Sequence, residues 1–334
     1  MVGAVQRLCT EELTMTRLSL PLAEQRHIYR LAEVEKALAG LEDNPSPLLK
    51  KTYLRMCEAG ETRLLVKPSN EFALEGLYDE CPNFKDILDD LRKYLELALF
   101  GGEALSVLPI LLLGDPGVGK THFAKSLAKA LQTEFEFCSM ATMSASWIIC
   151  GAASSWKDAR PGKVAMRIID GHYANPVIVL DELDKAVNSN FDPVGPLYQL
   201  FERDTATHFK DEFIDIQLDA SHIVWVCTAN DLASIPDPIV SRMMVYEVRR
   251  PTKDEARRIA QRMYQALLRE HSWAFASELS NDALDALSSI PPREMKKKLL
   301  DALGQARMNR RDYIDPLDIG KTASREQRGI GFTY

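Results

Sequence analysis

The stretch Gly114-Asp115-Pro116-Gly117-Val118-Gly119-Lys120-Thr121 decides the fold of this 334-residue chain. It follows the apolar run Ile110–Leu113 and leads into Thr121–Leu131, where apolar residues recur at helical spacing. Strand, tight glycine-rich turn and helix in that order is the setting in which a GxxxxGK[ST] pattern binds phosphate. A chance match somewhere in a chain of this composition has a probability of roughly 1%. The stretch therefore predicts a phosphate-binding loop.

Each residue type in this loop has a role in holding a nucleoside triphosphate. Glycines let backbone N–H groups turn inward around phosphate oxygens, and the following helix presents its N-terminal N–H groups to the same phosphates. Lys120 should reach the β and γ phosphates, and Thr121 should offer its hydroxyl to Mg²⁺. The candidate nucleotide-binding residues are Gly114, Asp115, Pro116, Gly117, Val118, Gly119, Lys120 and Thr121.

A second run adds two carboxylates to this site. Val177–Leu180 is a short apolar run typical of a strand buried on both faces, and Asp181 and Glu182 follow it directly. Ligands of parallel sheets bind at the carboxyl ends of the strands, so this pair should lie beside the phosphate-binding loop. We predict that Asp181 holds Mg²⁺, through water, and that Glu182 is the general base for the attacking water. The alternative is a solvated strand end, which the loop upstream disfavours.

Three more polar residues fit the same chemistry. Asn230 ends a third apolar strand, where it could orient the attacking water or contact the γ-phosphate; otherwise it forms a turn. Arg242 precedes the last strand and could act as an arginine finger on a neighbouring subunit's nucleotide, or form a surface salt bridge. Arg293 begins a helix after two prolines, where its guanidinium could close on the phosphates, or stay solvated or salt-bridged.

The middle of the chain alternates strands and helices. Five short apolar or β-branched runs are the candidate strands: Ile110–Leu113, Glu134–Cys138, Val177–Leu180, Ile223–Thr228 and Met244–Val248. The first two are joined by a loop and a helix, and such a βαβ unit has parallel strands. Residues 71–250 are therefore predicted to be an α/β nucleotide-binding domain, with a five-stranded parallel sheet between helices.

Helical patterns precede this domain. Residues 1–70 are predicted to be a short helical segment that is separate from the domain. A helical stripe of apolar residues covers Leu22–Leu41, and a second helix is expected over Leu48–Glu58. Prolines between the two stretches, and again near residue 68, mark a break and a linker.

Residues 251–334 are predicted to form a small helical lid and a C-terminal tail. Thr252 and Glu255 make the capping box that opens the first helix. Ser280 or Asn281 should cap a second, short helix. A third helix should follow Pro291-Pro292.

Composition narrows the class of protein. The chain is 46% apolar and 27% charged, as in ordinary soluble globular proteins, and its apolar runs are too short to span a bilayer. The net charge of −7 argues against a protein built to coat nucleic acid or anionic membrane. The six cysteines form no CxxC pair and the N-terminus lacks a signal-peptide pattern, so a reducing cytoplasm is the expected compartment.

Together these motifs resemble the AAA+ superfamily and, within it, the ATPase module of Lon proteases. The general likeness rests on the phosphate-binding loop, Asp181-Glu182, Asn230, Arg242 and Arg293 in that order. Four further stretches are similar to elements of Lon. Arg160–Lys163 is similar to MPGK, and Leu180–Lys185 is similar to LDEIDK. Asp192–Leu200 with Phe209–Phe213 is similar to DPxxALLEVLD with FxDHY, and Ile235–Met243 is similar to IPxPLLDRM. The resemblance covers about residues 75 to 310.

The resemblance implies an ATPase that uses ATP and Mg²⁺ and forms a ring, hexameric by the family's pattern, with a central pore that pulls on polypeptide. Trp156 stands at the position of the family's pore aromatic residue, and Lys157 replaces an aliphatic one. A Trp packed in the fold or in a subunit interface is the alternative. The adenine pocket is expected near Tyr78–Phe84, where Cys81 takes the place of an aromatic residue.

The resemblance also sets limits. Lon proteases carry a C-terminal Ser-Lys peptidase domain, and too few residues follow Arg293 to form one, so no protease activity is expected. The family's large N-terminal substrate domain is replaced by residues 1–70, which we expect to bind a partner or substrate.

Three functions remain open at this point. The first is a chaperone-like motor that remodels or unfolds proteins, which the Lon-like elements and Trp156 favour. The second is a nucleic-acid-linked ATPase, such as a loader or a mobile-element or defence component. The lid permits it, since it carries 15 Lys and Arg against 12 Asp and Glu from Pro251 onward, with Lys296–Lys298 in a row. The third is a non-enzymatic assembly switch that binds ATP to form a ring and hydrolyses it poorly, against which Glu182, Asn230 and Arg242 argue.

Overall fold

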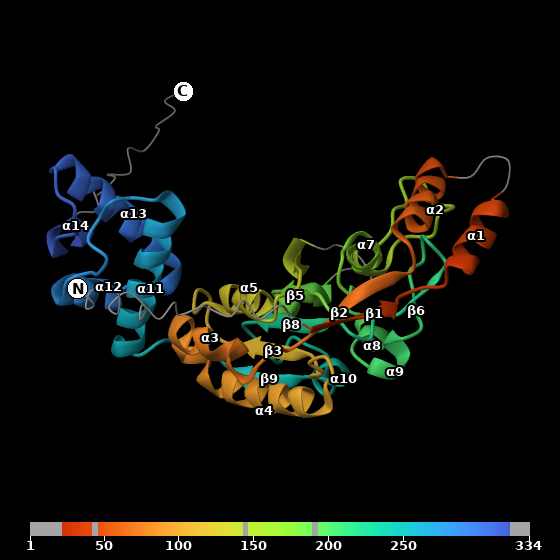
Figure 1. The fold of residues 1–334 in the computed structure, drawn as a ribbon, viewed down its shortest axis with the longest axis horizontal. Helices are drawn as coiled ribbons and strands as arrows, with labels where there is room; N and C mark the ends of the chain where they lie inside the picture. Colours follow the sequence, from red (N-terminus) through yellow and green to blue (C-terminus); the bar gives the residue numbers. More distant parts are fainter. Residues whose placement is uncertain (1–21, 42–45, 143–145, 189–192, 321–334) are drawn as a thin grey trace, which may run out of the picture.

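The centre of the protein is a parallel sheet of five strands. The structure is a computed structural model that describes residues 22–41, 46–142, 146–188 and 193–320. The strands lie in the order β4-β5-β8-β3-β9 (Figure 1). They are β3 (Ile110–Leu113), β4 (Phe135–Ser139), β5 (Val177–Asp181), β8 (Val224–Ala229) and β9 (Met244–Glu247). The predicted α/β class and its five parallel strands are confirmed.

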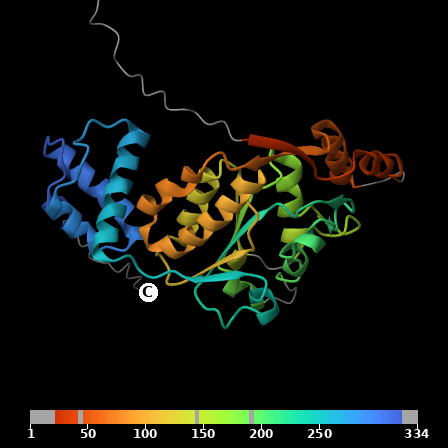
Figure 2. The same ribbon diagram turned by 60° about the horizontal axis from the view of Figure 1, so that its bottom comes forward.

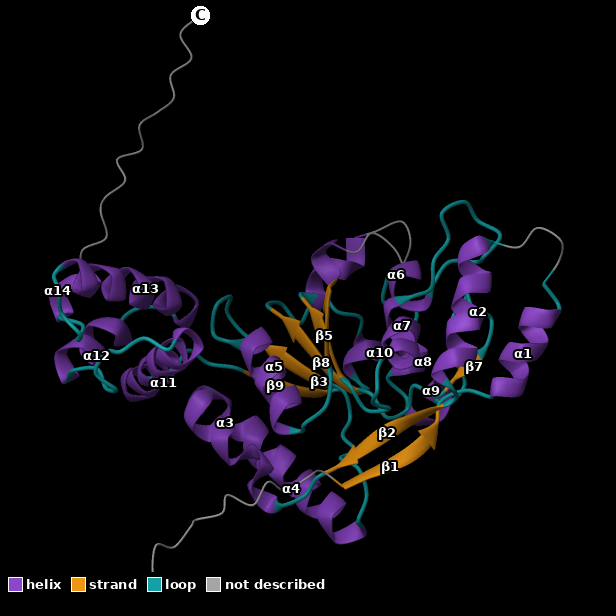
Figure 3. Ribbon diagram, turned by 45° about the horizontal axis from the view of Figure 1, so that its top comes forward, coloured by secondary structure: helices purple, strands orange, loops and turns teal. Residues whose placement is uncertain are grey.

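Helices bury the sheet on both faces (Figure 3). Side chains alternate along a strand, so Ile110 and Leu112 of β3 enter one core, with α4 (Lys85–Gly101) and α5 (Lys120–Ala130). Leu111, between them, enters a second core together with α7 (Lys163–Asp170). Because both faces are covered, the strands read in the sequence as continuous apolar runs.

The other elements of this region are short. The remaining helices are α3 (Glu75–Glu80), α6 (Trp147–Cys150), α8 (Leu197–Leu200), α9 (Arg203–Ala206) and α10 (Asp237–Val240). Two residues each form the antiparallel pair β6 (Phe209–Lys210) and β7 (Gln217–Leu218). Among the described helices, none has the length and apolarity needed to cross a bilayer.

The N-terminal segment contains two strands that the prediction lacks, β1 (Leu22–His27) and β2 (Thr62–Lys67). It contains the two expected helices, α1 (Leu31–Ala39) and α2 (Pro47–Ala59). The helix predicted from Leu22 is wrong over its first part, because β1 is a strand that pairs antiparallel with β2. Pairing with a strand that lies beyond two helices in the chain overrides local helical spacing, and the sequence pattern carries no sign of it. Residues 1–21 lie outside the described part of the chain, as do the predicted motif residue Asp192 and the tail 321–334.

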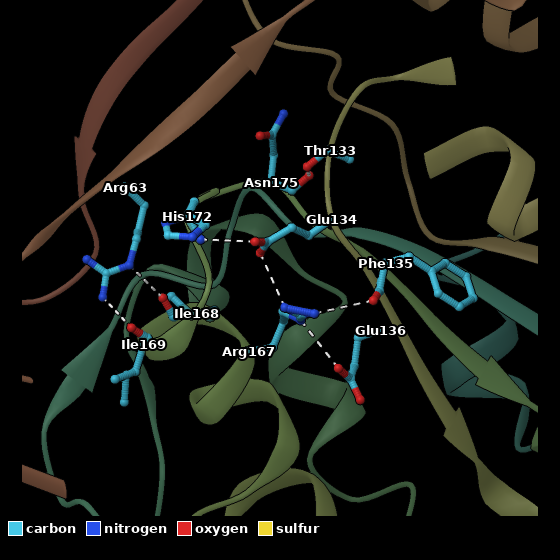
Figure 4. A network of polar contacts seen from close by, with 10 residues as sticks. All are labelled: Arg63, Thr133, Glu134, Phe135, Glu136, Arg167, Ile168, Ile169, His172 and Asn175. Carbon is cyan, nitrogen blue, oxygen red and sulfur yellow. Dashed lines mark hydrogen bonds and ion pairs between the residues drawn. The ribbon is translucent and has the colours of Figure 1, made fainter. Parts of the chain in front are cut away.

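The N-terminal segment packs against the α/β unit and does not stand apart from it. Arg63 of β2 is only 5% exposed and donates from Nε to the Ile168 carbonyl at the end of α7, over 3.0 Å (Figure 4). On the other side of α7, Arg167 pairs with Glu134 and with Glu136 of β4, both at 3.3 Å. Helix α7 is therefore held between the antiparallel pair β1–β2 and the sheet.

The lid forms as predicted. Its helices are α11 (Lys253–His271), α12 (Asn281–Ser288), α13 (Pro292–Met308) and α14 (Pro316–Gly320). The capping box of Thr252 and Glu255 is present, and Ser280 caps α12. The lid has its own apolar core and lies beside α3, at the end of the molecule away from the strand pair β1–β2 (Figure 2). Arg262 of α11 pairs there with Asp79 of α3 at 2.5 Å.

Candidate nucleotide-binding site

Three neighbouring strands end at one edge of the sheet and bring the predicted site residues together. In the ladder, β8 lies between β5 and β3, so Gly114, Asp181 and Asn230 follow adjacent strand ends. The Gly114 N–H donates to the Ala229 carbonyl at 3.2 Å, which extends the ladder one residue into the loop. The site therefore lies at the carboxyl edge of a parallel sheet, where such sheets bind ligands.

The loop Gly114–Thr121 turns sharply from β3 into α5. Gly119 has φ +105°, a conformation that L side chains rarely adopt, and α5 begins at the next residue. A Cβ on Gly114 would lie 2.4 Å from the Val248 carbonyl oxygen, so the backbone approach at that position requires glycine. The glycines thus let the loop wrap around the N-terminus of α5, which leaves backbone N–H groups available for an anion.

Lys120 joins this loop to the end of β8. Its Nζ donates to the Gly114 carbonyl, to the Asp115 carbonyl at 3.2 Å and to Asn230 Oδ1 at 2.9 Å. Burial lowers the pKa of Lys120, and the carboxylates of Asp181 and Asp184 act in the opposite direction. The ammonium group is therefore a buried charge held by neutral oxygens and by carboxylates nearby, an arrangement suited to meeting further negative charge.

The expected magnesium ligands lie in contact. Thr121 Oγ1 and Thr228 Oγ1 both donate to Asp181 Oδ1 at 2.8 Å. Hydroxyl and carboxylate oxygens are hard ligands of the kind Mg²⁺ binds, usually together with phosphate oxygens and water. Thr121 and Asp181 therefore fit a magnesium ion by the chemistry of their donor atoms.

Glu182 has an unusual backbone. Its φ is +59°, in the left-handed region that non-glycine residues seldom adopt. The Glu182 N–H donates to Thr228 Oγ1 at 3.0 Å, so the threonine that bonds Asp181 also fixes the next residue. Strained backbone of this kind is kept where the surroundings determine it, often at functional sites. The strain turns the chain away from the strand direction directly after Asp181.

The lid reaches the phosphate-binding loop. A Cβ on Gly117 would lie 3.4 Å from the Cβ of Arg293, at the start of α13, so the predicted lid arginine is adjacent to the loop. Arg250, in the connection to the lid, pairs with Asp115 at 2.8 Å. Asn83, within the predicted adenine region, donates to the Val118 and Arg249 carbonyls, both at 3.2 Å. The segment Tyr78–Phe84 thus lies where loop and lid connection meet.

Arg242 makes its contacts elsewhere. Its Nη2 pairs with Glu202 Oε1 at 2.8 Å, and its Nη1 donates to the Pro238 carbonyl at 2.6 Å. The guanidinium also lies over the ring of Tyr198, 5.8 Å from the centroid. These contacts hold it among α8, α9 and α10, and none of them joins it to the phosphate-binding loop of its own chain.

Trp156 is exposed. Its relative exposure is 58%, near the middle of the loop 151–162, and Lys157 beside it is also exposed. The Trp147 ring of α6 lies edge-on to it, with 6.2 Å between centroids and 72° between planes. This exposure does not agree with the alternative that Trp156 packs inside the fold of its own subunit.

Four residues of the site were missed in the sequence. Thr228 bonds both Asp181 and the Glu182 backbone, and Asn83 and Arg250 fix the loop against the lid connection. Asp184 is buried, and the ammonium group of Lys185 lies 2.9 Å from its Oδ2. A hydroxyl residue two positions before Asn230 was a usable signal for Thr228. Asn83 and Arg250 depend on contacts between distant segments.

Comparisons with known proteins identify a family and relatives for part of the chain. Residues 110–250 match the family model described as the ATPase family associated with various cellular activities (AAA). The chain is 37% identical over 162 residues to Lon protease 2 of Hydrogenovibrio crunogenus, and the matched region covers 48% of this chain and 18% of that protein. It is 31% identical over 243 residues to the Lon protease of Nitrosococcus oceani, covering 69% of this chain and 31% of that one.

The chain also resembles part of one solved structure, the Thermotoga maritima RuvB Holliday junction branch migration motor, with a TM-score of 0.48 at 20% identity, covering 71% of this chain and 67% of that chain. The chain spans less than a third of the length of either Lon relative.

Proposed function

Since residues 110–250 belong to the ATPase family associated with various cellular activities, and the chain is related to the ATPase region of Lon proteases, we propose that it is an ATP-hydrolysing motor that remodels or unfolds protein substrates. The observation that carries the substrate class is the exposed Trp156 on the loop 151–162. An aromatic side chain presented to solvent can grip unfolded polypeptide through apolar contact that does not depend on sequence.

The site residues take the following roles in this proposal. The loop Gly114–Thr121 and Lys120 hold the triphosphate of ATP, and Thr121 and Asp181 hold Mg²⁺, which when bound neutralises charge on the phosphate oxygens. Glu182 accepts a proton from the attacking water. Asn230 orients that water, and its bond to Lys120 keeps its amide at the site. Arg293, beside Gly117, couples the phosphates to the lid.

The proposal includes a ring, hexameric as in the family, in which Arg242 acts on the nucleotide of the neighbouring subunit. Its contacts with Glu202 and Tyr198 support this, because they hold the guanidinium away from the loop of its own chain. Residues 1–70 are proposed to bind a partner or substrate. The cytoplasm is the proposed compartment. A nucleic-acid-linked role is the alternative from the sequence, and the Lon relatives do not favour it.

Replacing Lys120 tests nucleotide binding. Lys120→Ala should weaken ATP affinity by about 10- to 100-fold, the effect of losing a hydrogen bond from a charged donor. The fold should survive, because the substitution removes a buried charge. Equilibrium titration with ATP and thermal unfolding would measure both, and Lys125→Ala, an exposed lysine of the same helix, is the matched control. Unchanged affinity in Lys120→Ala would contradict the assignment.

Replacing Trp156 tests the substrate class. Trp156→Ala should lose most of the stimulation of ATPase activity by an unfolded protein, while turnover without that protein continues. Trp156→Phe should keep part of the stimulation because an aromatic ring remains. Steady-state ATPase rates with and without unfolded casein would show this. Trp273→Ala removes another partly exposed Trp, in the lid, and should behave as the wild type. A wild-type protein that no unfolded polypeptide stimulates would rule out the remodelling function.

A further inference from the structure

The loop that carries Trp156 has a closed neck. Its two ends, Gly151 and Gly162, are so near each other that a Cβ on Gly162 would lie 2.5 Å from Gly151 N and 2.2 Å from the Ile149 carbonyl oxygen. Just inside the neck, the Ala152 N–H donates to the Arg160 carbonyl at 3.2 Å. Residues 155–158 at the tip are exposed, and Gly151 and Gly162 at the neck are buried. The direction of the tip therefore depends on how the neck is held.

One buried carboxylate holds this neck. Asp211 is completely buried, and its Oδ2 accepts the Gly162 N–H at 2.8 Å. On the other side of the neck, Gly151 has φ +77°, and a Cβ there would lie 2.4 Å from Asp211 Oδ1. The Asp211 carboxylate therefore touches both ends of the loop, and glycine at each end makes the contact possible.

Asp211 is itself fixed by a tight turn. Its Oδ1 accepts the N–H groups of Phe213 at 3.0 Å and Ile214 at 3.1 Å. From behind, Tyr53 of α2 donates its hydroxyl to the Ile214 carbonyl at 2.6 Å. Burial raises the pKa of Asp211 to about 6, against the lowering effect of the three N–H donors. The carboxylate is thus a buried acceptor, and its position is set by the turn at Phe213 and Ile214 and by Tyr53 of α2.

We propose that Asp211 is the positioning residue of the substrate-gripping loop: its carboxylate closes the neck between Gly151 and Gly162 and so directs Trp156 at the polypeptide. This inference rests on the proposed function and adds to it a residue that does not touch substrate. The N-terminal segment takes part through Tyr53, which braces the turn that carries Asp211.

The substitution Asp211→Asn isolates the neck contact. Asn has nearly the same volume but a single acceptor oxygen, and its NH₂ group can only donate. If the oxygen stays with Phe213 and Ile214, the NH₂ faces the Gly162 N–H, and two donors meet where a hydrogen bond was. The turn survives and the neck opens. Glu212→Gln makes the same chemical change on the next, exposed carboxylate and is the matched control.

Two measurements on the full-length protein test the proposal. Amide hydrogen exchange of residues 152–162 should become faster in Asp211→Asn and stay unchanged in Glu212→Gln, with amides of β5 and β8 as the internal check that the sheet is intact. The concentration of unfolded casein that gives half-maximal stimulation, relative to each variant's own basal rate, should rise about tenfold in Asp211→Asn, as when one charge-assisted hydrogen bond is lost. Glu212→Gln should match the wild type.

The two measurements distinguish a failure of the neck contact from a failure of its role in positioning Trp156. Unchanged exchange at residues 152–162 would overturn the clamp, and faster exchange with unchanged half-maximal concentration would overturn its role in positioning Trp156. If amides of β5 and β8 also exchange faster in Asp211→Asn, Gly151→Ala opens the neck from the other side and must give both expected effects. Failure of the proposed function looks different: the wild type itself would show no stimulation, and the positioning role would fall with it.

Discussion

Glu182→Gln should bind ATP nearly as tightly as the wild type and lose about 10²- to 10⁴-fold in turnover, the usual contribution of a positioned general base. The substitution changes neither backbone nor side-chain volume. The Glu182 N–H keeps its bond to Thr228 Oγ1, so the strained turn and the contact of Asp181 with Thr121 should be preserved. What is lost is the capacity of the carboxylate to take a proton from water.

Single-turnover and steady-state ATPase rates, with a separate titration of ATP binding, distinguish this effect from damage to the site. Glu247→Gln is the control, since Glu247 is the last residue of β9, at the same edge of the sheet, and takes no part in the proposed chemistry. Turnover by Glu182→Gln within a few fold of the wild type would exclude Glu182 as the base. Loss of ATP binding would instead indicate a structural role.

The sequence predicted those parts of the site that depend on local signals. The loop Gly114–Thr121 and the run before Asp181 each combine a strand pattern with residues of fixed spacing, and parallel strands then bring their ends to one edge of the sheet. The lid helix was predicted from the capping box of Thr252 and Glu255 for the same reason, because the two residues are three apart in the chain.

The parts that were missed depend on partners far apart in the sequence. Strand β1 exists because β2 pairs with it, and nothing in Leu22–His27 itself distinguishes it from a helix end. Arg63 looks like an ordinary surface charge in the sequence, and the motif Phe209–Phe213 gives no structural role for Asp211, yet both are buried and bonded to backbone groups of remote segments. Such residues are determined by packing, which no spacing rule describes.

Arg242→Ala should lower ATP turnover about 10³-fold, as expected for loss of an arginine finger, and leave nucleotide binding to isolated subunits intact. The structure gives the reason for the second part, because Arg242 contacts Glu202 and Tyr198 and no residue of Gly114–Thr121 in its own chain. Measured turnover and ATP affinity of the purified variant test both parts. A loss of affinity as large as that expected for Lys120→Ala would place Arg242 in its own subunit's site.

Mixing the Lys120→Ala and Arg242→Ala variants decides between action within one subunit and action on the neighbour. A Lys120→Ala subunit still carries Arg242, and an Arg242→Ala subunit still carries an intact phosphate-binding loop. In a ring whose interfaces are head-to-tail, an Arg242→Ala subunit next to a Lys120→Ala subunit regains a complete site, and random mixing at equal amounts restores about a quarter of all sites. If Arg242 acted on its own nucleotide, no mixed interface would be complete. Activity would then stay at the level of the separate variants at every ratio.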